Sequence, residues 1–338
     1  MYTLIRRLLF LFPAEFSHNL GLKGLKLIYF LGLVYLLASR GKNKTVEAFG
    51  LQFSNPVGLA AGLDKNGDYI DALGSLGFGF IEVGTVTPRA QPGNPKPRLF
   101  RLNKQGALIN RMGFNNKGVA HMVERLKRRR FKGIVGVNIG KNYSTPLEQA
   151  HEDYLFCLRE LYPFADYIVI NLSSPNTPGL RALQFGEGLN SLLSVLKAEQ
   201  KMLSDKHDKY VPLLLKIAPD ISVNECEDIA QALLYYKMDG VIATNTTVSR
   251  NGVEESVFSD ETGGLSGSPM ENISVDTVRN LKHQLRGVIP IIGVGGIHDY
   301  ASAERKYKAG ANLLQLYTGF IYRGPELITE AIDASVAD

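Results

Sequence analysis

Eight short apolar runs that alternate with helix-length segments predict an α/β fold, a (β/α)8 TIM barrel, for this chain of 338 residues. The runs are apolar throughout rather than at every second residue, which is typical of parallel strands buried on both faces. Eight such units within about 290 residues favour a closed barrel over an open doubly wound sheet. The runs begin at Asn55, Phe78, Gly133, Asp166, Val211, Asp239, Val288 and Ala311. The helix-length segments between them include residues 116–130, 188–203, 222–238 and 300–310.

The first 44 residues differ from the rest and predict an N-terminal amphipathic helical hairpin. They contain two apolar runs, Leu8–Phe12 and Leu27–Ala38. The longer run has twelve residues, which is too short for the roughly 20 that cross a bilayer. The residues between the runs predict a turn between two short helices, and they include Glu15, His18, Gly21 and Gly24.

Three interpretations of residues 1–44 are open: a hairpin on a membrane surface, a segment that packs on the barrel, or a signal peptide without a clear cleavage site. Charge favours the first. The segment has seven basic residues and one acidic residue, whereas the rest of the chain has 31 basic and 32 acidic residues. A basic, apolar segment beside a neutral barrel favours an anionic membrane surface as partner and argues against nucleic acid.

The overall composition excludes several other classes of protein. A hydrophobic content of 45% with 21% charged residues excludes intrinsic disorder. Cys157 and Cys226 are too few for a disulfide framework, and neither lies in a cluster with metal-ligand spacing. We therefore expect no metal site and a reducing compartment.

Polar side chains follow nearly every predicted barrel strand. The functional site of such a barrel lies at the C-terminal ends of its strands, so we expect these side chains to surround one mouth. The alternative for each residue alone is an ordinary cap or turn. The residues are Lys65, Thr85, Asn138, Asn171, Lys216, Thr244, Asn245, Thr246, Gly295, Gly296, Tyr317 and Thr318.

Glycine-rich turns after the seventh and eighth strands, IGVGGI from Ile292 and YTG from Tyr317, predict a phosphate site. The GGLSG segment, residues 263–267, is expected to add a third flexible backbone segment. Lys216 ends an apolar run and needs an anionic partner unless it reaches solvent. Beside a phosphate-bearing ring it would hold negative charge on a reduced flavin. No GxGxxG motif follows the first strand, so a Rossmann nicotinamide site has no support.

The loop after the fourth strand, NLSSPNTPGLRALQ, contains the candidate catalytic residue Ser174. No histidine or aspartate nearby in sequence builds a triad, so this serine is poorly suited to acyl transfer. It could accept a proton if it were shielded from water and relayed through Thr177. An ordinary ST turn is the alternative.

Eight motifs together resemble the quinone-linked, membrane-associated class of the dihydroorotate dehydrogenase family. They occur in order between about residue 45 and residue 323. The soluble class has cysteine at the position of Ser174 and lacks an N-terminal extension, so both features favour the membrane-associated class. The motifs are AAGLDKNG, EVGTVTPRAQPGNPKPRLFRL, NRMGFNN, NLSSPN, KIAPD, NTT, GGLSG and GVGGI.

The resemblance implies a flavoenzyme that oxidises (S)-dihydroorotate to orotate in de novo pyrimidine biosynthesis, with one FMN that a membrane quinone reoxidises. Ser174 would remove the C5 proton while hydride leaves C6. The FMN residues implied are Ala61, Gly62, Lys65, Thr85, Asn138, Asn171, Lys216, Thr244, Gly267, Gly296, Tyr317 and Thr318. The dihydroorotate residues implied are Lys65, Asn110, Arg111, Met112, Gly113, Phe114, Asn171, Asn176, Asn245 and Thr246. The quinone residues implied are His18, Arg101 and Tyr317.

The resemblance also divides the chain into a membrane-associating quinone entrance, residues 1–44, and an FMN-binding barrel, residues 45–338. It implies a monotopic protein without an obligate protein partner. The absence of an Arg- and Ser-rich presequence favours the cytoplasmic face of a bacterial cell membrane. Two other functions are kept open: an FMN barrel oxidoreductase with a nicotinamide acceptor, and a catalytically silent module on a membrane surface.

Overall fold

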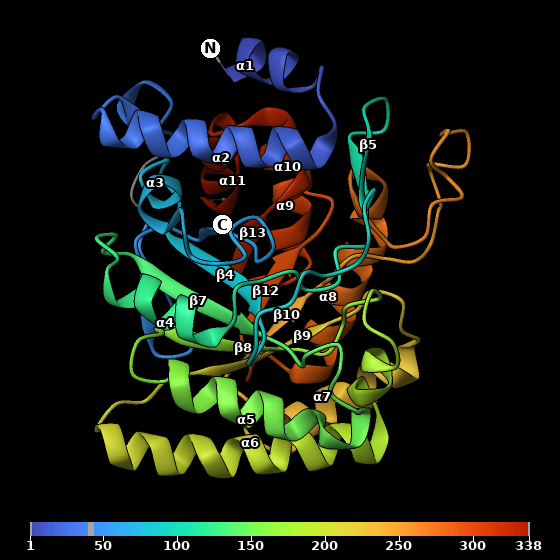
Figure 1. Cartoon of the computed structure of the whole chain (residues 1–338). Helices are drawn as coiled ribbons and strands as arrows, with labels where there is room; N and C mark the ends of the chain where they lie inside the picture. The colour runs from blue at the N-terminus through green and yellow to red at the C-terminus, as the bar shows by residue number, and fades with distance from the viewer. Residues whose placement is uncertain (1, 40–43, 337–338) are drawn as a thin grey trace.

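Eight parallel strands close into a barrel at the centre of the protein (Figure 1). The computed structural model describes residues 2–39 and 44–336. The strand order is β10-β12-β13-β3-β4-β7-β8-β9, and β9 pairs with β10 to close the barrel. All eight predicted strands are confirmed. They are β3 (Val57–Leu59), β4 (Phe80–Val86), β7 (Ile134–Ile139), β8 (Tyr167–Asn171), β9 (Leu213–Ile217), β10 (Gly240–Ala243), β12 (Ile291–Val294) and β13 (Leu313–Leu316).

Helices cover the outside of the barrel, and the four predicted helical segments are among them (Figure 1). Ser222 and Asp299 form capping boxes at the starts of α7 and α9, which satisfy backbone N–H groups that a helix leaves unpaired. The helices that follow residue 44 are α3 (Ile70–Gly74), α4 (Val119–Lys127), α5 (Ala150–Leu161), α6 (Gly186–His207), α7 (Val223–Tyr235), α8 (Glu271–Leu285), α9 (Tyr300–Lys308), α10 (Thr318–Arg323) and α11 (Glu326–Asp333).

Two apolar clusters hold the barrel together, one between strands and helices and one inside the barrel. The inner cluster includes Phe80 and Tyr167, both fully buried. A hairpin of β1 (Val46–Ala48) and β2 (Leu51–Phe53) adds Phe53, whose ring lies 5.1 Å from that of Phe80. Because Phe80 begins β4 and Tyr167 begins β8, the hairpin packs against the N-terminal ends of the strands. The opposite mouth is therefore the one available for a site.

A three-stranded antiparallel sheet, which the sequence analysis did not predict, consists of β5 (Leu99–Leu102), β6 (Ala107–Asn110) and β11 (Gly264–Gly267). The expectation of a flexible segment at residues 263–267 was wrong. This segment pairs with β6, and a Cβ atom at Gly264 would lie only 1.9 Å from Thr246 Oγ1. These glycines allow close approach of a strand rather than flexibility.

The N-terminal segment forms helices α1 (Tyr2–Leu9) and α2 (Ala14–Phe30), but the predicted turn at residues 15–24 was wrong. The chain turns at residues 10–13, and Pro13 immediately precedes α2. Each glycine inside a helix lowers its stability by only about 1 kcal/mol relative to alanine. Tertiary contacts stabilise α2 despite Gly21 and Gly24. Ser17 Oγ donates to Leu9 O at 2.6 Å, and Leu22 is buried. Residues 40–43, at the end of the predicted segment 1–44, lie outside the described residues.

Large apolar side chains of this segment face away from the barrel. Examples are Leu8, Leu11 and Phe30, which are 58%, 79% and 69% exposed. No helix within residues 2–39 and 44–336 has both the length and the apolar content to span a membrane. The segment lies over α10 and α3 at one end of the protein (Figure 1).

Candidate active site

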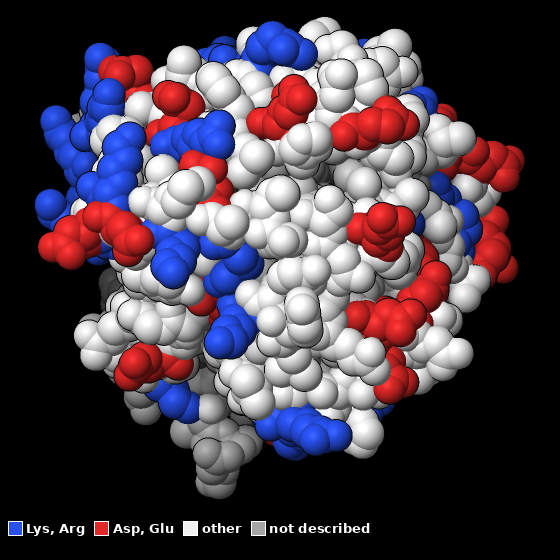
Figure 2. All heavy atoms as spheres, turned by 90° about the horizontal axis from the view of Figure 1, so that it is seen from below, with Lys and Arg blue, Asp and Glu red and all other residues white. Residues whose placement is uncertain are grey.

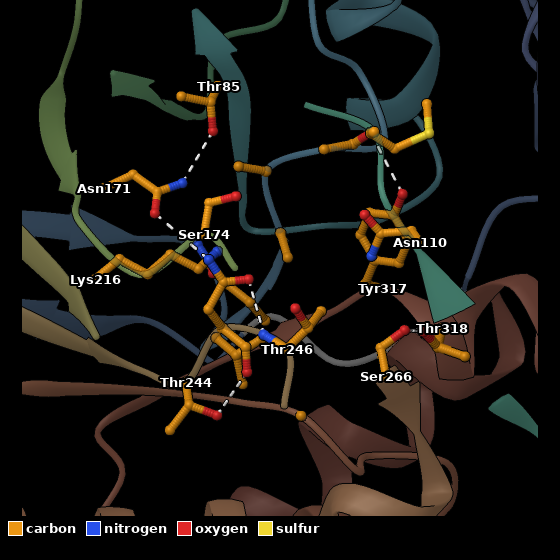
Figure 3. A pocket seen from close by; sticks show the side chains of 18 of the residues that line it. Thr85, Asn110, Asn171, Ser174, Lys216, Thr244, Thr246, Ser266, Tyr317 and Thr318 are labelled. Carbon is orange, nitrogen blue, oxygen red and sulfur yellow. Dashed lines mark hydrogen bonds between the residues drawn. The ribbon is translucent and has the colours of Figure 1, made fainter. Parts of the chain in front are cut away.

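A cavity lies at the C-terminal mouth of the barrel, the position predicted for the site, with about 1030 Å3 of empty space that is partly open to solvent. All barrel strands except β7 contribute lining residues at or just beyond their ends. Strands β6 and β11 of the second sheet supply Asn110 and Ser266 from the side. Figure 3 shows the labelled side chains from these elements converging around one space. Most of the predicted cofactor and substrate residues are therefore brought together.

A buried network of amide and hydroxyl groups forms one wall. Asn171 Nδ2 donates to Thr85 Oγ1 at 3.0 Å (Figure 3). It also donates to Asn138 Oδ1 at 3.0 Å. Thr85 Oγ1 donates to the same Asn138 oxygen at 2.5 Å. Asn245 Nδ2 donates to Ser173 Oγ at 3.0 Å. Buried polar groups that are satisfied in this way have fixed orientations, so the wall is arranged before any ligand binds.

A charged pair lies beneath this wall. Glu82 is fully buried, and its Oε1 lies 3.8 Å from Lys216 Nζ and accepts from Asn138 Nδ2 at 2.9 Å. Burial lowers the pKa of Lys216, and the negative charge of Glu82 opposes that shift. Gln315 Nε2 donates to Glu82 Oε2 at 2.5 Å. Lys216 thus has the anionic partner that the sequence analysis required.

Ser174 lies on the loop after β8 and is 6% exposed. Its Oγ accepts from the backbone N–H of Asn176 at 3.3 Å. The Asn176 side chain in turn donates to Asn110 O at 3.2 Å. Within the described residues, no hydrogen bond joins Ser174 to the predicted relay residue Thr177. The same part of the chain has no group of three or more His, Cys, Asp or Glu side chains that could hold a metal ion. Ser174 is thus a shielded hydroxyl in a cavity lined by amides.

Lys65 brings a second positive charge to the cavity. Its Nζ donates to Gly62 O at 2.7 Å. Burial lowers the pKa of Lys65 to about 8, so the side chain is charged at pH 7. Tyr317 OH donates to the same carbonyl at 3.4 Å, which places the aromatic ring beside Gly62. An anionic ligand at this end would meet a cation next to an aromatic face.

Gly296, which follows β12, and Gly267, at the end of β11, lie where neighbouring backbone leaves no room for a Cβ atom. A Cβ atom at Gly296 would lie 2.2 Å from Glu271 Cα, and its φ of +76° is one that glycine adopts without strain. Gly267 has a φ of +105°. Ser266 Oγ and Thr318 Oγ1 lie 2.8 Å apart in the same region (Figure 3). The backbone N–H groups of these glycines and the two hydroxyls are the kinds of donor that suit a phosphate.

Four predicted site residues lie outside the cavity lining. Asn138 is buried and accepts a hydrogen bond from Asn171, which lines the cavity. Arg111 turns away: its guanidinium bonds Glu261 at 2.5 Å and lies over the Phe100 ring. His18 and Arg101 are on the side of the N-terminal helices.

Arg101 and His18 have environments of their own. Arg101 Nη2 donates to Phe10 O at 2.8 Å and to Phe12 O at 2.9 Å, and thereby holds the turn between α1 and α2. Burial and the nearby Lys65 ammonium lower the pKa of His18 to about 3. The imidazole is therefore neutral at pH 7. Tyr317 is the one predicted quinone residue that lines the cavity within the described structure, and the quinone assignment stays a prediction.

Comparison with known proteins identifies the family. A family model described as dihydroorotate dehydrogenase matches residues 44–336. The chain belongs to the dihydroorotate dehydrogenase family. It is 56% identical over 331 residues to the "Dihydroorotate dehydrogenase (quinone)" of Cellvibrio japonicus, with 98% of this chain and 97% of that protein covered. A Pseudomonas paraeruginosa protein with the same name is 55% identical over 337 residues, covering 100% of this chain and 98% of that protein.

The fold is also that of a solved dihydroorotate dehydrogenase. The crystal structure of DHODH from Eimeria tenella in complex with ferulenol superposes with a TM-score of 0.86 and 38% identity, covering 95% of this chain and 90% of that one. This likeness confirms the predicted barrel.

Sequence reasoning missed three residues of this dihydroorotate dehydrogenase site. Glu82 and Gln315 are polar residues inside the apolar runs FIEVGTV and LLQL, a signal that could have identified them. Arg181 ties the Ser174 loop to its neighbours. Its Nε donates to Ser173 O at 3.1 Å, its Nη1 pairs with Asp220 at 2.8 Å, and its Nη2 donates to Thr246 O at 2.9 Å. No local pattern marks Arg181, because its partners are distant in sequence.

Proposed function

We propose that this chain oxidises (S)-dihydroorotate to orotate in pyrimidine biosynthesis, uses one bound FMN, and is reoxidised by a membrane quinone. The observation that carries the proposal is one cavity that combines the shielded hydroxyl of Ser174 with Lys65, Lys216 and a wall of asparagines. Membership of the dihydroorotate dehydrogenase family supports the same reaction. The names of the Cellvibrio and Pseudomonas relatives support quinone as the acceptor.

The cavity fits a flavin mononucleotide. Gln315 Oε1 is a buried acceptor that has no hydrogen-bond partner in the described structure, so a ligand donor would satisfy it. Lys216 supplies buried positive charge, and the backbone at Gly267 and Gly296 with Thr318 suits the phosphate. When bound, FMN would supply hydride acceptance from C6 of the substrate. The residues that would hold it are Ala61, Gly62, Lys65, Thr85, Asn138, Asn171, Lys216, Thr244, Gly267, Gly296, Tyr317 and Thr318, with Asn138 acting through its neighbours.

Amide side chains suit the dihydroorotate ring because each provides both a donor and an acceptor for its imide edges. Asn110, Asn171, Asn176 and Asn245 all line the cavity. Lys65 would bind the substrate carboxylate, since its ammonium is charged at pH 7. The remaining substrate residues that line the cavity are Met112, Gly113, Phe114 and Thr246. Arg111 lies outside the cavity and would act by holding the end of β6 through its bond to Glu261.

Ser174 Oγ is proposed to accept the C5 proton while its own hydroxyl proton passes to solvent through the open part of the cavity. The backbone N–H of Asn176 donates to this oxygen and would stabilise the negative charge that it carries as the hydroxyl proton leaves. Because Ser174 is only 6% exposed, the effective dielectric around it is low and this interaction is stronger. Arg181 would act as a positioning residue, since it fastens the backbone next to Ser174 to two other strand ends.

Residues 1–44 are proposed as the membrane-docking and quinone-entrance part, and residues 45–338 as the FMN barrel. The exposed apolar side chains of α1 and α2 support docking, because such a patch on a monomer marks an interaction surface. His18, Arg101 and Tyr317 would lie at the quinone head group, and neutral His18 could donate or accept a hydrogen bond there. We place the protein on the cytoplasmic face of a bacterial cell membrane, with dihydroorotate, quinone and anionic lipid as its partners.

The test is a two-step assay on purified protein. Anaerobic dihydroorotate should bleach the yellow flavin, and a quinone analogue in lipid vesicles should restore the colour. A colourless protein that cannot be reconstituted with FMN would contradict the proposal and indicate a silent membrane-surface module. Reoxidation by a nicotinamide but not by quinone would indicate the other kind of barrel oxidoreductase.

A further inference from the structure

Another pocket lies outside the catalytic cavity, between the end of α2, α3 and the end of α4, with about 680 Å3 of empty space that is partly open to solvent. Figure 2 shows Lys and Arg side chains gathered along one edge of the protein, on the side where Figure 1 draws α4. None of the pocket's residues lines the catalytic cavity, and Lys26, Tyr29 and Phe30 belong to the proposed docking segment. Its basic lining residues are Lys26, Arg125, Arg128, Arg129 and Arg130.

The two acidic residues in the pocket give Arg128 and Arg130 no carboxylate partner. Asp71 accepts from the backbone N–H groups of Arg130 and Phe131 at 2.8 and 2.9 Å. Asp68 is paired with Lys117, His121 and Arg125 at 2.8, 2.9 and 3.4 Å. Both carboxylates are therefore occupied by groups other than the guanidiniums of Arg128 and Arg130.

Arg128 and Arg130 carry most of the surplus charge. Arg128 is exposed and pairs only with Glu124, at 3.3 Å on the helix surface, a kind of contact that contributes little. Arg130 is exposed and makes no ion pair within residues 2–39 and 44–336. Guanidinium groups of this kind bind phosphate through paired N–H donors.

Apolar side chains lie directly beside these charges. Tyr29 and Phe30 of α2 line the same pocket, and Phe30 is 69% exposed. Leu27 and Leu31, one helical turn apart, are 60% and 62% exposed. The surface therefore changes from cationic to apolar within one pocket, as an amphiphile with an anionic head requires. A soluble polyanion such as nucleic acid would leave the apolar part uncovered.

We propose that this pocket binds the phosphate headgroup of an anionic phospholipid, whose acyl chains lie along the exposed apolar face of α2. The inference rests on the membrane docking proposed above and adds a defined site on the barrel itself. Arg128 and Arg130 contact the phosphate, and Phe30 contacts the first part of the chains. The protein would then bind anionic bilayers in preference to zwitterionic ones, with α4 as well as α2 at the surface.

Vesicle binding by the full-length holoenzyme tests the site. Arg128→Gln with Arg130→Gln should weaken binding to vesicles containing 30% phosphatidylglycerol by about tenfold to thirtyfold, since each basic residue contributes about 1 kcal/mol. Binding to pure phosphatidylcholine vesicles should stay unchanged. The matched control is Lys201→Gln with Lys206→Gln on α6, which removes equal charge from exposed positions at the far end of the protein (Figure 1). Activity with dihydroorotate and a soluble dye should be normal in both, which shows that they are folded.

The outcomes separate this inference from the proposed function. If the wild-type protein binds vesicles but both double variants lose the same affinity, the attraction is diffuse and the pocket assignment is wrong. If the wild-type protein binds neither vesicle, the membrane docking itself fails, and the inference with it.

A spectroscopic reporter distinguishes a lipid from a free phosphate. The chain has no tryptophan, so Phe30→Trp creates a single reporter in the pocket. Monomeric dihexanoyl phosphatidylglycerol should change its emission saturably, and Arg128→Gln with Arg130→Gln should raise the midpoint at least fivefold. An equal response to inorganic phosphate, or no saturable response to the lipid, would overturn the lipid assignment.

Discussion

The barrel mouth buries polar side chains, whereas the N-terminal segment exposes apolar ones. At the mouth, Asn171, Thr85 and Glu82 are buried polar groups that are linked through Asn138 across β4, β7 and β8. In the segment, twelve large apolar side chains between Leu4 and Leu36 are exposed, against ten in all the rest of the described chain. These polar groups of the mouth have their partners within the barrel, whereas the exposed apolar side chains of the segment have no covering surface in the described structure.

The way in which the segment is fastened sharpens this contrast. No residue of α1 is buried, and in α2 only Ser17 and Leu22 are. Polar contacts hold it instead: Tyr2 OH donates to Ile321 O at 2.6 Å, and Arg98 Nη2 pairs with Glu15 at 2.8 Å. The barrel therefore depends little on the segment for its core, while the segment depends on the barrel for its orientation.

The largest expected effect is at the mouth. Ser174→Ala should slow flavin reduction by dihydroorotate about 10²-fold to 10⁴-fold, the range for a positioned base, while FMN stays bound. Stopped-flow bleaching of the flavin measures this. Ser174→Cys, which keeps an ionisable group, should retain part of the rate, and near-normal bleaching in the alanine variant would remove Ser174 from this role.

Lys216→Met should weaken FMN retention by about tenfold or more and lower the flavin midpoint potential, because the Glu82 carboxylate then lies buried beside the ring without its cation. Redox titration and flavin occupancy after dialysis measure both. Lys209→Met is the control, since Lys209 is half-buried outside the cavity and bonds Ala165 O. An unchanged potential with full occupancy would contradict the assignment.

Deletion of residues 2–39 should separate the two regions. Flavin reduction and turnover with a soluble dye should stay near normal, whereas turnover with a long-chain quinone in vesicles should fall about tenfold, because the apolar docking surface is lost. Equal turnover with both acceptors, together with undiminished vesicle binding, would show that the segment serves packing alone.

The smallest effect concerns pH. Lys65 has a pKa lowered by burial to about 8, so its positive charge is present below that pH and is lost above it. KM for dihydroorotate should then rise about fourfold between pH 7 and pH 8.5, following the protonated fraction. Lys65→Arg, which keeps its charge, should give a flat profile, and a wild-type profile equally flat would assign carboxylate binding to another group.

The sequence by itself determined the barrel and most of the mouth. Continuous apolar runs are a local property, so all eight strands were predictable. Because parallel strands in a barrel end at one mouth, polar residues after them, such as Thr85, Asn171 and Lys216, were predictable as a group. The motif NLSSPN identified Ser174 through its resemblance to a family rather than through its chemistry.

Only the tertiary structure decided which distant residues meet. It placed Glu82 beneath Lys216, fastened Arg181 to Asp220, and paired GGLSG with β6 as a strand. It also moved the N-terminal turn to residues 10–13, where Arg101 binds the backbone. Periodicity and propensity describe neighbours along the chain, whereas these contacts join residues that come together only when the barrel closes and the second sheet forms over it.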